Sequence, residues 1–476
     1  MNGQEQMPLY EALQHHIQSN PLSFHVPGHK GGLLFKEKSK LFAADITEIT
    51  GMDDLYHPTG ILLKAQKLLT DLYGSDNSLF LVNGSTVGNL AMIYGTCSEG
   101  DLVLVQRNCH KSIIHGLMLA KVRPVFLEPE YERDWGIAKG ISIQTLADAL
   151  KLYPEAKALI VTYPNYYGMA DKIEDLIKLA HKYKIPVLVD EAHGAHFIGK
   201  DPFLRSSLQL GADVVVQSAH KTLPSLTMGA YLHIREGLIR AESIQQALSI
   251  LQTSSPSYLI MASLDYARSY IGTFTENDLQ FWRKYKEEIH ERLSAISGIN
   301  IYQDPFTDPL KVTLKLTNGD SGQTFQRLLE EQGIYPEFSD PANVLLIFPL
   351  FKKAHEKEAL AYLNVLEDAL KKITIYTAKE REKKHSPFQS SSNRVRTPEV
   401  PLYQAKVSDK RWIPITEAPG KVSGGMIIPY PPGIPLIMPG ESIEQRHIEE
   451  LKRLLEHKTH IQGDGWNENH QILVLA

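Results

Sequence analysis

The stretches IPVLVDEAHG (185–194) and DVVVQSAHK (213–221) decide the fold of this chain. Each begins with a short apolar run that lacks polar alternation, which is typical of a strand covered by helices on both faces. Each run ends at polar residues, Asp190 in the first and Ser218 to Lys221 in the second. Because ligands of open α/β sheets collect beyond the carboxyl ends of strands, we expect these polar residues to lie at a site.

Five more apolar runs alternate with helical patterns, and together with the first two they predict an α/β domain with a mostly parallel, seven-stranded sheet. They are LFLV (79–82), LVLV (102–105), VRPVFL (122–127), ALIVTY (158–163) and GAYLHI (229–234). Beyond them, apolar segments near 300–306, 310–316 and 342–351 with helices between them predict a small α+β domain. We therefore expect an N-terminal arm plus large domain over 1–300, the small domain over 301–380, and a linker with a Pro-rich C-terminal domain over 381–476.

Composition and charge narrow the class of protein. With 476 residues and 43% hydrophobic content the chain can bury a sizeable core. The formal net charge of -5 gives no basic excess for nucleic acid. The two cysteines are too few for a disulfide framework, and no apolar run is long enough to span a membrane. We expect a soluble, cytoplasmic protein that binds neither nucleic acid nor membrane.

The region after the small domain has two contrasting parts. Residues 378–397 are charged and Ser-rich, which predicts a linker or mobile loop, or else a solvated helix followed by a short loop. Nine prolines then occur from Pro398 to Pro439. Apolar residues interleave these prolines and favour burial, so we disfavour an exposed Pro-rich ligand.

Lys221 follows an apolar strand beside Ser218 and His220, so an amine is presented at the edge of the sheet. Such an amine can hold the aldehyde of pyridoxal phosphate (PLP) as a Schiff base and later donate a proton. Ser218 and His220 could then bind phosphate oxygens. A surface lysine in a loop is the competing interpretation of this tetrapeptide alone.

Asp190 ends a buried run, and a carboxylate there needs a strong partner to offset desolvation. The protonated ring nitrogen of PLP is such a partner, and this pairing makes the ring an electron sink. A metal site with His193 and His196, or a helix N-cap, would also explain the residue. Asp190 lies one strand–helix–strand unit before Lys221, which favours PLP.

Two further segments have the residues that this cofactor needs. Gly84-Ser85-Thr86 opens a helical stretch and can bind phosphate at a helix N-terminus, although simple N-capping is the alternative. His110 follows another strand and could lie against one face of the PLP ring, with the small Ala192 against the other. A lone histidine is more often merely packed or solvated.

Taken together, these segments resemble the ornithine/lysine/arginine decarboxylases of PLP fold type I, the fold of aspartate aminotransferase. The resemblance also includes residues 25–32 (HVPGHKGG), 45–48 (DITE), 108–112 (NCHKS) and the terminal PYPPGIPLIMPGE (429–441), in the family's order. PGHK begins at residue 27, so we expect no N-terminal wing domain of the kind that many larger members carry. Asn165 also stands where many members have threonine.

The resemblance implies roles for individual residues. Lys221 is the Schiff-base lysine, Asp190 pairs with the pyridine nitrogen, and His110 stacks on the ring and is, with Lys221, a candidate proton donor. The other expected cofactor-binding residues are Ser85, Thr86, Thr162, Ala192, His193, Ser218 and His220. Thr162 resembles the family residue near the phenolic oxygen, and the Pro-rich segment with Glu441 resembles the part that closes the substrate pocket. The site is expected at a homodimer interface.

The implied reaction is decarboxylation of a basic amino acid with PLP and no metal. The short architecture resembles arginine decarboxylases of polyamine synthesis, so arginine with agmatine as product is preferred over lysine and ornithine. The cationic tail needs a carboxylate, for which Glu441 and Glu417 are candidates, as are Glu48, Asp53 and Asp54. Two rivals remain: another fold type I reaction, such as that of an aminotransferase or aldolase, and an inert PLP-binding homologue.

Overall fold

The chain divides into two compact units, each built from two separate stretches of sequence. The first unit comprises Met1–Cys97 and Ile173–Thr275, and the second comprises Ser98–Lys172 and Glu276–Ala476. The computed structural model describes residues 3–19, 27, 30, 33, 40–170, 172–377, 394–430, 433–456 and 459–476. Most of the motif at 25–32, most of the linker at 378–397, and Pro431 and Pro432 lie outside these ranges.

Four strands of the first unit lie in the order β1-β9-β8-β7, with β7 and β8 parallel and β9 antiparallel to β8 and β1. The strands are β1 (Asn77–Leu81), β7 (Val187–Asp190), β8 (Val214–Gln217) and β9 (Ala230–Ile234). The helices are α1 (Pro8–Gln18), α2 (Lys40–Ala43), α3 (Ile61–Tyr73), α4 (Gly84–Tyr94), α7 (Ile173–Lys182), α8 (Ala219–Thr222), α9 (Ala241–Leu251) and α10 (Tyr258–Gly272).

Close packing holds α4 against β8, and a buried ion pair holds the N-terminal residues in place. A Cβ added to Gly88 would come within 2.6 Å of a Val216 methyl, so α4 can approach β8 only with glycine at that position. A fully buried ion pair between Arg268 and Asp265 anchors the N-terminal residues, because Arg268 also donates to the Gln4 carbonyl at 2.6 Å. Asp265 in turn accepts from the Leu9 N–H at the start of α1.

The second unit contributes the strands β6-β2-β3-β14 to the large sheet. β2 is parallel to β3 and to β6, whereas β14 is antiparallel to β3. These strands are β2 (Leu102–Gln106), β3 (Arg123–Leu127), β6 (Ala158–Thr162) and β14 (Val395–Arg396). The connecting elements are α5 (Lys111–Leu119), β4 (Tyr131–Glu132), β5 (Ile137–Ala138) and α6 (Ile143–Leu152).

All seven predicted strands are present, and the prediction of an α/β fold with a large, mostly parallel sheet is confirmed. The predicted number of strands was wrong, because the sheet has eight. The additional strand, β14, has only two residues and comes from the polar segment after the small domain. Its pairing with β3 uses backbone groups and needs no apolar run, so periodicity gave no signal for it.

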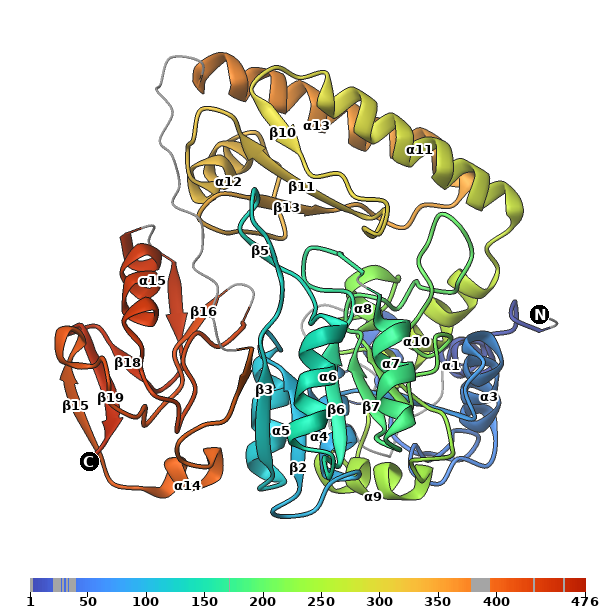
Figure 1. Cartoon of the computed structure of the whole chain (residues 1–476). Helices are drawn as coiled ribbons and strands as arrows, with labels where there is room; N and C mark the ends of the chain where they lie inside the picture. Colours follow the sequence, from blue (N-terminus) through green and yellow to red (C-terminus); the bar gives the residue numbers. More distant parts are fainter. Residues whose placement is uncertain are drawn as a thin grey trace. The chain divides into compact units, whose positions relative to one another are not determined.

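The second unit also contains the predicted small α+β layer, in which four strands lie in the order β10-β11-β13-β12. Helices α11 and α13 run side by side along it (Figure 1), and Arg292 on α11 donates to Glu367 on α13 at 2.7 Å. The elements are α11 (Glu276–Ser294), β10 (Ile299–Ile301), β11 (Lys311–Leu316), α12 (Gly322–Glu331), β12 (Phe338–Ser339), β13 (Val344–Ile347), η1 (Lys353–His355) and α13 (Glu356–Thr377).

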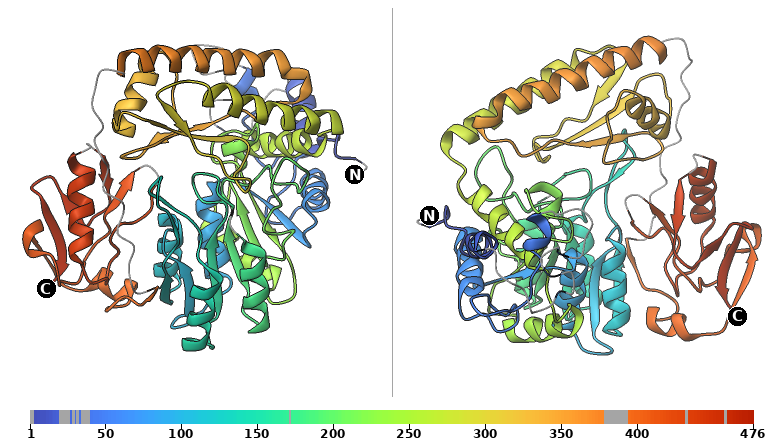
Figure 2. Two further views of the ribbon diagram at one scale, coloured as in Figure 1. Left: turned by 45° about the horizontal axis from the view of Figure 1, so that its top comes forward. Right: turned by 180° about the vertical axis from the view of Figure 1, so that it is seen from behind.

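The C-terminal residues form short strands with one amphipathic helix, α15, packed on them (Figure 2). Their buried cluster includes Ile427, Ile437, Leu451 and Val474. Among the prolines, Ile427, Ile428 and Ile437 are therefore buried as expected, whereas Ile434 and Leu436 are partly buried. The elements are α14 (Leu402–Val407), β15 (Lys410–Pro414), η2 (Ile415–Glu417), β16 (Ile428–Tyr430), α15 (Gln445–Glu456), β17 (His460–Gln462), β18 (Trp466–Asn467) and β19 (Gln471–Leu475).

A membrane-spanning helix would need a long apolar stretch. None of the helices in the described part of the chain combines the required length and hydropathy.

Candidate active site

Lys221 lies in α8, the single helical turn that follows β8, and its side chain is half-buried. Its Nζ is 3.1 Å from Nε2 of His193, which follows β7. Because β7 and β8 are parallel neighbours, the polar residues after each strand meet at one edge of the sheet. The structure therefore brings together two of the residues expected from sequence.

Asp190 is the last residue of β7 and is almost completely buried. Its Oδ2 accepts from Nδ2 of Asn89 at 2.9 Å, and its Oδ1 accepts from the Ala192 N–H at 3.2 Å. Burial raises the pKa of the Asp190 carboxyl, and the Lys221 amine, Asn89 and the Ala192 N–H partly offset this effect. A carboxylate desolvated to this degree fits a cationic hydrogen-bond donor, such as a protonated pyridine nitrogen.

Ser85 and Ser218 meet at the start of α4, where the Ser218 hydroxyl donates to Ser85 Oγ at 2.7 Å. Gly84 adopts a left-handed φ of 74° at the first position of this helix, and the space that its Cβ would occupy is open. The side chain of Asn83, the N-cap residue, makes no capping hydrogen bond to the helix. A helix N-terminus flanked by two hydroxyls fits a phosphate group.

Thr86, His220 and Ala192 are the other residues of the first unit that are expected to contact the cofactor, and each has different neighbours. Thr86 is exposed in the first turn of α4. His220 Nδ1 lies 3.0 Å from the Gly229 carbonyl, so this nitrogen carries a proton and donates to it. Ala192 is partly exposed, and its carbonyl accepts from the Ser218 N–H at 3.3 Å.

A metal site at Asp190, His193 and His196 was the alternative explanation of Asp190, and the described residues contain no cluster of ligands that supports it. No three His, Cys, Asp or Glu side chains gather there as ligands. His196 instead packs edge-on against the rings of Phe197 and Phe203.

His110 and Thr162 belong to the second unit. His110 is the N-cap of α5, where its Nδ1 accepts from the Ser112 N–H at 3.2 Å, so the ring proton is on Nε2 in the neutral form. Thr162 ends β6, and within the described residues its buried Oγ1 has no hydrogen-bond partner. An orphaned buried hydroxyl fits a polar ligand atom. The expected place of Thr162 near the cofactor stays a prediction.

Arg107 engages Glu441, one of the two carboxylates expected to bind substrate. Arg107 Nε and Nη2 donate to the two oxygens of Glu441 at 3.1 and 2.9 Å, and the Met438 N–H donates to Oε2 at 2.9 Å. Arg107 also donates to the Pro435 carbonyl at 2.7 Å. Glu441 thus anchors the Pro-rich segment to the end of β2, whereas Glu417 is exposed in η2. Their roles toward substrate stay predictions.

The Pro-rich segment also contacts His110. The Gly433 carbonyl accepts from the Lys111 N–H at 3.2 Å, and a Cβ at Gly433 would lie 3.4 Å from His110 Cδ2. Gly433 has a left-handed φ of 87°. The C-terminal segment therefore packs on the imidazole that the sequence predicts to stack on the cofactor.

Sequence reasoning missed Asn89, Glu191 and Arg107. Asn89 had a signal, because it is an isolated amide in the apolar helical stretch VGNLAMIYG (87–95). Glu191 is fully buried, where it accepts from the Ser207 N–H at 2.6 Å and from Gln217 Nε2 at 2.7 Å. Burial raises the pKa of Glu191 to about 7. No local pattern indicated Glu191 or Arg107, since their partners are remote in sequence.

Comparison with known proteins identifies the family. The family model for the Orn/Lys/Arg decarboxylase major domain matches residues 7–305, and that for the C-terminal domain matches 382–463. A Bacillus subtilis protein called YaaO is 42% identical, with 98% of each chain covered. A Bacillus subtilis arginine decarboxylase is 33% identical, with 99% of this chain and 98% of the relative covered.

Solved structures show the same fold. The Francisella novicida lysine decarboxylase LdcF has a TM-score of 0.78 at 20% identity, with 98% of this chain and 81% of that chain covered. The fold is therefore that of the PLP fold type I enzymes. With both domains of the family matched in order, the chain belongs to the Orn/Lys/Arg decarboxylase family and is a PLP-dependent amino acid decarboxylase.

Proposed function

We propose that this enzyme decarboxylates arginine to agmatine and CO2 for polyamine synthesis, acting as a homodimer with a shared active site. The observation that carries the chemistry is the group formed by Lys221, His193 and the buried Asp190 at the ends of two parallel strands. Support for arginine comes from the relative named arginine decarboxylase, which matches nearly the whole chain. Lysine and ornithine are the alternatives within the family.

The residues of the first unit would hold the cofactor. The Lys221 amine would bind its aldehyde, and Ser85, Thr86, Ser218 and His220 would hold its phosphate at the start of α4. Asp190, kept in place by Asn89, would pair with the ring nitrogen. When bound, PLP accepts the electron pair that is left at Cα as CO2 departs.

The remaining proposed roles concern the ring and the proton. His110 would lie against one face of the ring and Ala192 against the other, with Thr162 near the phenolic oxygen. The proton delivered to Cα would come from Lys221 or His110. His193, at 3.1 Å from the Lys221 amine, is placed to exchange a proton with it.

The deciding experiment measures CO2 and amine release by the PLP-loaded enzyme from arginine, lysine, ornithine and a panel of neutral amino acids. We expect release from arginine, its loss in Lys221→Ala, and a crippled Asp190→Ala variant that retains some cofactor. Lys182→Ala, which removes an exposed lysine from α7, is the matched control and should be fully active.

Other outcomes of this experiment would overturn the proposal. Release from lysine or ornithine alone would assign the other substrate, and keto acid without CO2 would point to a different PLP reaction. Bound PLP with no turnover would indicate an inert homologue. Light scattering would test the homodimer, which a monomeric mass for the active enzyme would contradict.

A further inference from the structure

The loop that follows β6 is closed on itself by hydrogen bonds. Asn165 Oδ1 accepts from the Met169 N–H at 2.8 Å, and the Asn165 N–H donates to the Met169 carbonyl at 3.1 Å. The Gly168 N–H donates to the Asn165 carbonyl at 2.9 Å. Since this closed loop begins directly after Thr162, a contact that fixes the loop also restrains that residue.

Lys311, the first residue of β11, brings a buried cation to this loop. Its side chain is 4% exposed, and its Nζ donates to the Tyr166 carbonyl at 2.5 Å. The same Nζ lies 5.5 Å from the centre of the Tyr166 ring. Burial of an ammonium group is costly unless the group is paired, and hydrogen bonds from a charged donor are roughly twice as strong as neutral ones. Lys311 therefore holds the middle of the loop firmly.

Gly168 makes room for the stem of this lysine. It has a left-handed φ of 85°, and an added Cβ would come within 2.8 Å of Lys311 Cδ. The neighbouring backbone is attached to the residues just before β11, because the Asp308 N–H donates to the Gly168 carbonyl at 2.9 Å. The Ala170 N–H likewise donates to the Phe306 carbonyl at 2.8 Å. The loop and the segment that leads into β11 thus fit each other closely.

Thr162 connects this attachment to the proposed site. Its buried Oγ1 has no hydrogen-bond partner within the described residues, and the proposed function gives it a place near the phenolic oxygen of PLP. A hydroxyl can bind a ligand atom at a fixed distance only if its own backbone is fixed. Because Thr162 is the last residue of β6, the loop beyond it decides where that backbone goes.

We propose that Lys311 is a positioning residue for the reaction. By holding the Tyr166 carbonyl it fixes the loop after β6, and through the loop it fixes the Thr162 hydroxyl that meets the cofactor. This role rests on the proposed function, which places Thr162 at the phenolic oxygen. It needs no contact between Lys311 and either the cofactor or the substrate.

Lys315 provides a matched control on the same strand. Its Nζ also donates to a backbone carbonyl, that of Asp134 at 2.8 Å, and lies 4.3 Å from the centre of the Trp135 ring. Asp134 and Trp135 lie between β4 and β5, and not in the loop after β6. Lys315→Met therefore removes the same kind of contact from a different loop.

The first measurement is hydrogen exchange of the PLP-loaded enzyme, followed by mass spectrometry. Lys311→Met should speed exchange in the peptide 162–170 about tenfold or more, because a hydrogen bond from a charged group that opposes local opening is lost. Lys315→Met should speed exchange only in the peptide 131–138. Unchanged exchange at 162–170 in Lys311→Met would show that the lysine does not hold the loop and would overturn the proposal.

The second measurement is equilibrium dialysis of PLP, together with the absorbance spectrum of the bound cofactor. Thr162→Val should weaken PLP binding about 2- to 10-fold and shift the absorbance, because one hydrogen bond to the cofactor is lost. Lys311→Met should do the same, and the double variant should be no worse than Thr162→Val alone, since the lysine acts through that hydroxyl. Lys315→Met should bind PLP as wild type.

Two outcomes of the dialysis would contradict the proposal, and they differ in what else they overturn. Additive losses of affinity in Lys311→Met and Thr162→Val would leave the lysine a purely structural role, with the proposed function intact. Wild-type affinity and spectrum in Thr162→Val would refute the proposed place of Thr162 and the role of Lys311 with it. Should Lys311→Met not fold, Lys311→Gln is the second variant, because its amide stops one bond short of the Tyr166 carbonyl, and the same results are expected of it.

Discussion

The Asn89 amide donates a 2.9 Å hydrogen bond to Asp190 Oδ2, and both side chains are at most 2% exposed. Burial raises the pKa of Asp190, and the Asn89 amide, a neutral donor, partly offsets this by stabilising the charged carboxylate.

We predict that Asn89→Leu weakens PLP binding by about 10- to 100-fold, because a buried hydrogen bond to a charged group contributes roughly 1.5–3 kcal/mol. Equilibrium dialysis of the cofactor measures the change. Met92→Leu, a conservative swap at a fully buried position of the same helix, is the control and should bind PLP normally. An unchanged dissociation constant for Asn89→Leu would show that Asp190 does not depend on this amide.

We predict that Glu191 makes the protein more stable in mild acid than at alkaline pH. Burial raises the pKa of its carboxyl from 4.5 to about 7, so its contribution is fully present below pH 4.5 and is lost as pH rises through 7. The loss is about 3 kcal/mol. Denaturant unfolding of wild type and Glu191→Gln at several pH values from 5 to 8 measures this effect. The free energy of unfolding of wild type should fall relative to that of the variant as pH rises. Parallel pH profiles would refute this account.

We predict that Arg107 and Glu441 are coupled by about 1–3 kcal/mol in unfolding, since both side chains are largely buried, 11% and 13% exposed. A double-mutant cycle with Arg107→Met and Glu441→Gln measures the coupling energy. The exposed pair of Lys121 and Glu99 is the control and should give less than about 1 kcal/mol. Additive single-mutant effects at Arg107 and Glu441 would mean that the pair does not hold the Pro-rich segment.

We predict that Gly433→Ala lowers kcat about 5- to 30-fold, because its new Cβ would contact His110 at 3.4 Å and relief of the left-handed strain, roughly 1–2 kcal/mol, would shift the segment against that imidazole. Gly420→Ala has the same backbone strain, with φ of 79° and no atom within 4 Å of the new Cβ. It should lose comparable stability but keep its kcat. Equal kcat for the two variants would separate His110 from catalysis.

The strands could be predicted from the sequence because each buried run is continuous and apolar, as in 102–105 and 214–217. The direction of β9 could not, since a strand buried on both faces has the same composition whichever way it runs. The place of Asp190 at the end of one strand, and of Lys221 shortly after the next, could be read from the sequence.

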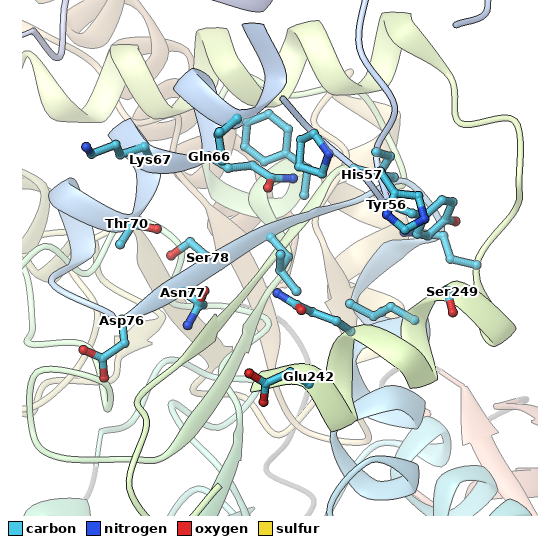
Figure 3. A pocket seen from close by; sticks show the side chains of 18 of the residues that line it. Tyr56, His57, Gln66, Lys67, Thr70, Asp76, Asn77, Ser78, Glu242 and Ser249 are labelled. Carbon is cyan, nitrogen blue, oxygen red and sulfur yellow. The ribbon is translucent and has the colours of Figure 1, made fainter. Parts of the chain in front are cut away.

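Side-chain partners that are remote in sequence could not be predicted. Arg107 and Glu441 are 334 positions apart, and nothing in either local pattern specifies the other. Glu441 was expected to serve substrate because the motif around it was visible, whereas the arginine that engages it was not. A cavity of about 710 Å³ beside β1 escaped for the same reason, since α3 and α9 line it from distant parts of the chain (Figure 3).

The pairing of β1 with β9 has a consequence for synthesis on the ribosome. Asn77 pairs with Ile234, and all of the second unit's first stretch, 98–172, is made between them. At ordinary translation rates β1 waits roughly 10 to 30 s for its partner strand. During that time β1 lacks β9, its partner strand, so the nascent chain can misassemble until the segment that carries Lys221 has also emerged.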